Sequence, residues 1–181
     1  MTRTTFFIRP VALAMLFTGL TFQACKDDDT TTEQENITTV EVHLTGPGMD
    51  MKFYWRDLDG PGGTAPVIDE ITLPAMTDNI MCHLHVYDES KTPTDNITEE
   101  IEAENVDHLF VLTPTGADVS IASDDTDDNG APFNLETLWT TGSASTGTLN
   151  IKLHHEPTDK ANTASPGGET DFDVTFPVKI Q

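Results

Sequence analysis

The sequence predicts an all-β fold: an antiparallel β-sandwich of about eight strands, immunoglobulin-like or Greek-key in its connections, with one short helix. Apolar and polar residues alternate through most of the chain after residue 38, which is the pattern of strands with one buried face. Glycine, proline and aspartate separate these segments, as turns do in sandwich proteins. The chain has 181 residues, of which 36% are hydrophobic, enough for one domain at residues 38–181.

Residues 1–24 have the composition of an export signal. Arg3 and Arg9 precede an apolar stretch at 11–22 that is too short to span a bilayer. The stretch ends in Phe22-Gln23-Ala24-Cys25, which resembles the bacterial lipobox, in which the cysteine is acylated and becomes the new N-terminus. We expect Cys25 to carry a lipid; the alternative is an ordinary secretory signal that happens to end near a cysteine.

Residues 25–37 form an acidic, flexible tether in this interpretation, because the segment from Lys26 to Asn36 contains no apolar side chain to bury. Lys26-Asp27-Asp28 resembles the signature that sends lipoproteins of the Bacteroidota to the outer face of the outer membrane. A generic solvated linker is the alternative. The expected location is therefore the outer membrane, with the domain lipid-anchored and facing the cell exterior.

The predicted strands follow the period-two segments in order. They lie at 40–44, 51–55, 67–73, 80–87, 108–112, 117–122, 146–154 and 171–180. Pro177 in the last strand indicates a sheet edge or a bulge, because proline has no N–H to donate. A short helix is predicted at 97–105, with Asn96 as N-cap and acidic Glu99 and Glu100 in its first turn. Residues 156–170 form a long exposed loop in this scheme.

The most specific motif is a calcium-type loop. Its ligands would be Asp125, Asp127, Asn129, the carbonyl of Ala131 and Glu136, with Gly130 at the bend, in the spacing D-x-[DN]-x-[DN]-G-x5-E. The strand-like pattern at 117–122 and Pro132 favour β-flanks over the helices of an EF-hand. An acidic, solvated turn is the alternative. Asp57 and Asp59, before Gly60, form a weaker candidate of the same kind.

Histidines suggest a second kind of metal site. On the strand at 80–87, His83 and His85 share one face with Met81, a pattern suited to zinc or copper. His154 is predicted on the outward face of another strand and is a candidate third ligand. The alternative is a polar outer face with no metal. Cys82 is expected in the core.

Composition narrows the function. The formal net charge of −22 excludes nucleic acid as a partner. No nucleophile motif or distinctive acid pair indicates an enzyme, so we expect none. Tyr54, Trp55 and Trp139 leave a glycan-binding module as a third hypothesis.

Several motifs resemble a family of small Bacteroidota surface lipoproteins that are encoded beside TonB-dependent outer-membrane receptors. They are Trp55-Arg56-Asp57-Leu58-Asp59-Gly60, Asp88-Glu89-Ser90-Lys91-Thr92-Pro93, Ile97-Thr98-Glu99-Glu100, Glu136-Thr137-Leu138-Trp139-Thr140-Thr141-Gly142 and Gly167-Gly168-Glu169-Thr170-Asp171. The resemblance implies a TonB-dependent receptor as partner. Members often carry the label of a type 1 periplasmic-binding fold, which needs a longer chain with repeated helix patterns, so we reject that label for this sequence.

The sequence thus predicts a lipid-anchored surface lipoprotein that binds a small ligand or metal ion as the accessory of an uptake system. A calcium-stabilised structural or adhesive sandwich is the alternative. The two differ in what a metal does: it only tightens the fold in the alternative, whereas the first hypothesis requires selective capture.

Overall fold

The computed structural model describes residues 35–181, together with Met1. The predicted signal peptide, Cys25 and most of the predicted tether lie outside the described residues. No helix in the described part of the chain is both long and apolar enough to cross a membrane.

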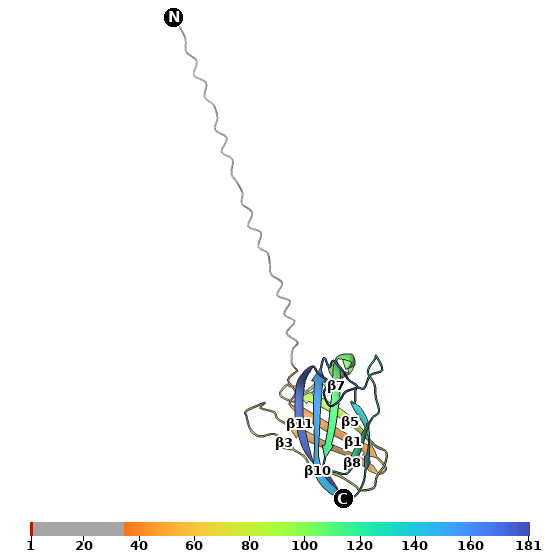
Figure 1. The fold of residues 1–181 in the computed structure, drawn as a ribbon. Helices are drawn as coiled ribbons and strands as arrows, with labels where there is room; N and C mark the ends of the chain where they lie inside the picture. The colour runs from red at the N-terminus through yellow and green to blue at the C-terminus, as the bar shows by residue number, and fades with distance from the viewer. Residues whose placement is uncertain (2–34) are drawn as a thin grey trace. The chain divides into compact units, whose positions relative to one another are not determined.

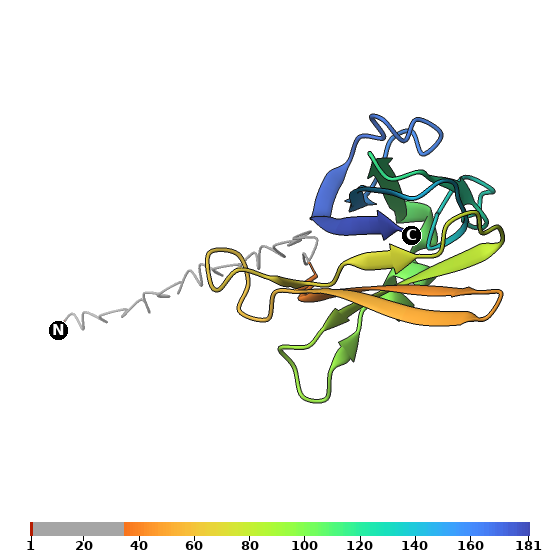
Figure 2. The same ribbon diagram turned by 90° about the horizontal axis from the view of Figure 1, so that it is seen from below.

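Residues 35–181 form a sandwich of two sheets, seen edge-on in Figure 2, which confirms the predicted all-β fold. The larger sheet has the order β3-β2-β1-β5-β9-β8, and β6 pairs with the C-terminal end of β5. Its strands are β1 (Thr39–Gly46), β2 (Met49–Arg56), β3 (Val67–Ile68), β5 (Ile80–Asp88), β6 (Asp95–Asn96), β8 (Val119–Ser123) and β9 (Glu136–Thr141).

The smaller sheet has the order β4-β11-β10-β7 and lies in front of the larger sheet in Figure 1. Its strands are β4 (Ile71–Leu73), β7 (His108–Thr115), β10 (Ser145–His155) and β11 (Glu169–Ile180). Within residues 35–181, the strands of both sheets pair antiparallel except for β4 with β11.

The core lies between the sheets and follows the alternation of each strand. On β11 the alternate residues from Phe172 to Ile180 are buried, and on β1 Val40, Val42 and Leu44 are fully buried. Trp139 of β9 and Phe110 of β7 are the largest side chains with no exposed surface. Each buried aliphatic or aromatic side chain contributes about 1.5–3 kcal/mol relative to leaving it in water.

The structure differs from the predicted strands at two places. The predicted strand at 67–73 is two short strands, because the chain leaves the larger sheet after β3 and enters the smaller sheet at β4. Residues 136–141, where no strand is predicted and where Glu136 is the expected last calcium ligand, form β9 between β5 and β8. Its alternation is real: Thr137, Trp139 and Thr141 are buried and face the core side.

Pro177 lies within β11 opposite Thr148, and β4 covers the other edge of β11 only from Val178 onward. Pro177 therefore occupies the first position where that edge has no neighbour, as expected for a residue without an N–H. The irregularity in the β10–β11 pairing lies elsewhere, between Leu153 and His154.

The predicted helix exists but is shorter than expected. Helix α1 spans Thr98–Ala103 and is followed by a 3-10 turn at Asn105–Asp107. The prediction that Asn96 caps the helix is wrong: Ile97 occupies the cap position, and the amide of Asn96 instead donates to Oε1 of Glu99. Buried Ile101 fixes α1 against the end of the sandwich where β7 begins (Figure 1).

Candidate metal centre

The outer face of the larger sheet carries histidines from two neighbouring strands. On β5, half-buried His83 and His85 alternate with core residues, which confirms the predicted placement of both on one face. Strand β1 pairs with β5 so that His43 lies opposite His83 and Glu41 lies opposite His85. The register thus adds one histidine and one carboxylate to the predicted pair.

Three of these four side chains lie close enough together to bind one ion, and His83 lies beside them. One potential ligand atom from each of Glu41, His43 and His85 lies within 4.8 Å of the others. The ring of His83 stacks on that of His85, with centroids 4.4 Å apart and planes 5° from parallel. We call Glu41, His43, His83 and His85 the outer histidine site.

Carboxylates orient two of these imidazoles. Nε2 of His43 lies 2.7 Å from Oδ1 of Asp50, and Nδ1 of His83 lies 3.3 Å from Oε1 of Glu136. If each of these nitrogens carries the proton donated to its carboxylate, the other ring nitrogen keeps a free lone pair. Metal-binding histidines in proteins are held in this way.

Glu41 is the buried member of the site, with only 4% of its side chain exposed. Nζ of Lys52 lies 2.8 Å from Oε1 of Glu41, and this bond raises the pKa of Lys52. The Lys52 side chain is about half exposed, so it can turn away into water if a metal ion takes its place beside Glu41.

His85 remains neutral down to a lower pH than an ordinary histidine does. Burial lowers its pKa, and the neighbouring His83 lowers it further. A neutral imidazole keeps the lone pair that a metal ion needs, so proton competition at His85 is weak near neutral pH.

The donor set fits zinc or copper. Both ions accept imidazole nitrogen, and zinc also takes carboxylate oxygen. In a tetrahedral zinc shell with bonds of about 2.0–2.1 Å, neighbouring ligand atoms are about 3.3 Å apart. The ligand atoms, which lie within 4.8 Å of one another, therefore have to approach by at most about 1.5 Å, which rotation of the partly exposed histidines can supply.

His154, the predicted third ligand, lies on β10 of the smaller sheet, whereas His83 and His85 lie on β5 of the larger sheet. The structure therefore does not bring His154 to the outer histidine site. Cys82 is fully buried as predicted, and burial raises the pKa of its thiol to about 12. At that pKa it stays protonated and is a poor metal ligand.

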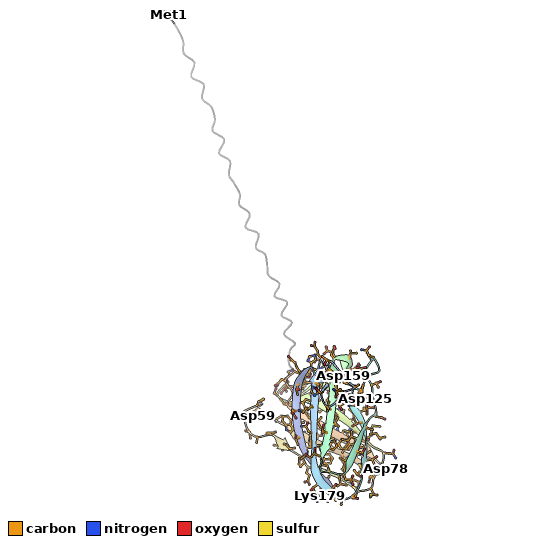
Figure 3. The ribbon with its side chains drawn as sticks, in the orientation of Figure 1. Met1, Asp59, Asp78, Asp125, Asp159 and Lys179 are labelled. Atoms are coloured by element: carbon orange, nitrogen blue, oxygen red, sulfur yellow. The ribbon has the colours of Figure 1, made fainter. Side chains whose placement is uncertain are left out.

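In the predicted calcium loop, Asp125 is engaged by the backbone. Its two carboxylate oxygens accept the N–H groups of Asn134, at 2.5 Å, and Glu136, at 2.8 Å. Glu136 itself belongs to β9 and turns its carboxylate toward His83. Figure 3 shows Asp125 at the edge of the domain, on the opposite side in that view from Asp59.

The rest of the loop is also satisfied from within the chain. Oδ1 of Asp127 accepts the N–H groups of Asn129 and Ala131, and Oδ2 lies 2.7 Å from the ammonium of Lys160. The carbonyl of Ala131 accepts the N–H of Asp127. Calcium at this loop stays a prediction, and an ion there would have to displace Lys160, whose side chain is 7% exposed. We call residues 124–136 the acidic loop.

The weaker pair, Asp57 and Asp59, follows β2. Oδ2 of Asp59 accepts the N–H of Thr64, and this bond lowers the pKa of Asp59. Oδ1 of Asp57 is buried without a hydrogen-bond partner. Among residues 35–181 neither aspartate belongs to a group of three clustered metal-binding side chains.

The aromatic residues do not form an open sugar-binding platform. Trp139 is fully buried, and Trp55 packs against the core. Tyr54 lies on the outer face, where the guanidinium of Arg56 covers its ring at 3.8 Å from the centroid. Stacking of a sugar on Tyr54 would therefore require Arg56 to move.

Two residues of the outer histidine site were not predicted, although the sequence contains a signal for them. Glu41 and His43 alternate with Val40, Val42 and Leu44, which puts them on the outward face of β1. What no spacing reveals is that β1 lies beside β5, since the pairing joins residues about 40 positions apart.

No protein-family model matches this chain, and no curated protein or solved structure matches it either.

Proposed function

We propose that this protein is a lipid-anchored surface protein that captures a transition-metal ion, zinc or copper, at the outer histidine site and serves as the accessory of an uptake system. The observation that supports it best is the convergence of Glu41, His43 and His85 within 4.8 Å on one sheet face. The carboxylates beside His43 and His83 support it further, because they leave one nitrogen of each ring free for the ion.

The exposure of the site favours exchange over permanent retention. The side chains of His43 and His83 are 24% and 31% exposed, so an ion there would remain accessible to solvent and to a partner. A structural zinc site is normally closed by four protein ligands, whereas an accessible site can pass its ion on. This is the behaviour that an accessory of an uptake system needs.

Metal analysis tests the proposal. Purified protein is stripped with a chelator, dialysed against zinc or copper and assayed for bound metal by elemental analysis. We expect the double variant His43→Gln/His85→Gln to lose one bound ion per chain relative to the parent. His154→Gln is the matched control, because it removes a histidine from the other sheet and should leave that ion in place. Equal metal content in the parent and the double variant would refute the proposal.

The location is tested separately. Cys25→Ser should prevent lipidation and release the protein from the outer-membrane fraction, because the lipid on Cys25 is the anchor in this proposal. Protease added to intact cells should remove the domain of the parent if it faces outward. Retention of the variant in the membrane, or full protection of the parent, would contradict this part of the proposal.

A further inference from the structure

A second group of potential metal ligands lies at one end of the smaller sheet. His108 opens β7, and His155 ends β10 directly opposite it in the strand register. Their rings stack, with centroids 4.8 Å apart and planes 19° from parallel. One potential ligand atom from each of His108, His155 and Asp171 lies within 4.8 Å of the others. We call these three residues the inner histidine cluster.

A register irregularity brings Asp171 into this group. In the pairing of β10 with β11, Leu153 lies opposite Phe172 and His154 lies opposite Thr170, so Asp171 is the extra residue on β11. An extra residue of this kind bends the strand and redirects a side chain, and such bulges are common next to functional sites.

The carboxylate of Asp171 is buried but not satisfied. Its side chain is 7% exposed, and Oδ2 has no hydrogen-bond partner. Nδ1 of His155 is 4.0 Å from Oδ1 of Asp171, which is too long for a hydrogen bond. Oε2 of Glu35 is also buried without a hydrogen-bond partner. Buried oxygens of this kind normally have a ligand, a water molecule or a donor.

His108 is held with one nitrogen available. His108 is 1% exposed, and its Nδ1 donates a hydrogen bond of 3.0 Å to the carbonyl of Glu104. The bond requires the proton on Nδ1, which leaves the lone pair on Nε2. Fixing the tautomer through a backbone carbonyl is a common way to support a metal-binding histidine.

The carboxylates at the cluster are not paired with a lysine or arginine in the described part of the chain. Within residues 35–181, none of the ion pairs made by lysine or arginine involves Glu35 or Asp171.

We propose that His108, His155 and Asp171 bind one divalent transition-metal ion, zinc by its ligand preference, as a buried site separate from the outer histidine site. Two imidazoles and a carboxylate are three of the four ligands of a zinc shell. The fourth position is filled by Glu35 or by water, and a Glu35 variant distinguishes the two. The ion would join the ends of β7, β10 and β11 and thereby stabilise this end of the sandwich.

The test uses the full chain in which the outer histidine site has been removed by His43→Gln/His85→Gln. In this background we expect one zinc ion per chain after dialysis and a rise in melting temperature of several degrees. Adding Asp171→Asn or His108→Gln should abolish both. Adding His154→Gln should change neither, because His154 precedes His155 on the same strand but does not belong to the cluster. Cobalt substituted for zinc should give the intense visible bands of a four-coordinate site.

The outcomes separate this inference from the proposed function. Loss of zinc on Asp171→Asn with the far-ultraviolet circular dichroism unchanged supports the buried site, whatever the outer histidine site does. Absence of zinc from the background variant overturns it, as does zinc content that survives Asp171→Asn. Glu35→Gln should lower the affinity at least tenfold if Glu35 is the fourth ligand and leave it within twofold if water is.

Discussion

The acidic loop and the inner histidine cluster both bury carboxylates, but they treat them in opposite ways. In the acidic loop, each oxygen of Asp125 and Asp127 has a backbone N–H or the ammonium of Lys160 as partner. In the inner histidine cluster, Oδ2 of Asp171 has none. The acidic loop resembles a metal site in the sequence, but its aspartates already have partners within the chain. The inner histidine cluster has an oxygen without a partner, but no sequence motif marks it. A buried carboxylate oxygen without a partner has to be explained, and at Asp171 two histidines lie beside it.

The largest expected effect comes from Lys160. Lys160→Ala leaves the carboxylate of Asp127 buried without its counter-charge, so we expect the free energy of unfolding to fall by about 3 kcal/mol. Lys152→Ala is the matched control: Lys152 pairs with Asp173, but both side chains are more than one-third exposed, and the expected loss is about 0.5 kcal/mol. Urea denaturation measures both. Equal losses would mean that burial of the Lys160–Asp127 pair does not increase its contribution to the free energy of unfolding.

The same substitution should act differently in the two regions. Asp125→Asn replaces an acceptor oxygen with an NH2 group that faces a backbone N–H, and we expect a loss of about 2 kcal/mol. Asp171→Asn removes a buried charge from an atom with no partner, so in metal-free protein we expect a change within about 0.5 kcal/mol or a gain. A large loss at Asp171 in chelator-treated protein would show that its carboxylate has a stabilising partner.

The stability contributed by the two regions should change with pH in opposite directions. The pKa of Glu35 is raised from 4.5 to about 7, so between these values the folded, metal-free protein binds more protons than the unfolded chain. The contribution of Glu35 to stability is therefore present below pH 4.5 and is lost as the pH rises toward 7. Burial alone would raise the pKa of Asp127, but the bonds from Lys160 and the backbone outweigh it and the pKa is lowered. The contribution of Asp127 is thus present at neutral pH and is lost in acid.

Melting temperatures across pH 4–8 with EDTA check this difference. Glu35→Gln should remove a part of the stability loss between pH 4.5 and 7, while Glu99→Gln, an exposed glutamate of α1, should leave the curve unchanged. Parallel curves for the parent and Glu35→Gln would contradict the raised pKa.

The smallest effect concerns calcium at the acidic loop. Because the ammonium of Lys160 occupies the side of Asp127 that an ion would take, Lys160→Met should bind calcium about fivefold more tightly than the parent, or about 1 kcal/mol. Calorimetric titration at constant ionic strength measures it. Lys152→Met should match the parent. If no calcium binds to Lys160→Met, the loop is the acidic turn that the sequence left open as an alternative.

Much of the molecule was predictable from the sequence because local alternation determines which side chains face inward. The buried faces of β1, β5 and β11, the position of Cys82 and the shared face of His83 and His85 all follow from a period of two. The calcium motif was equally visible, but a motif specifies only residue types and spacing. It could not reveal that Lys160, more than 30 positions away, supplies the cation.

Only the tertiary structure decided which faces meet. Strand pairing places Glu41 and His43 beside His85 and His154 in the other sheet, and it makes Glu136 the first residue of β9. The inner histidine cluster depends on three strand ends and an irregular register, none of which leaves a local pattern. The physical reason is that the alternation of a strand is set by its own residues, whereas its neighbours are chosen by the packing of the whole core.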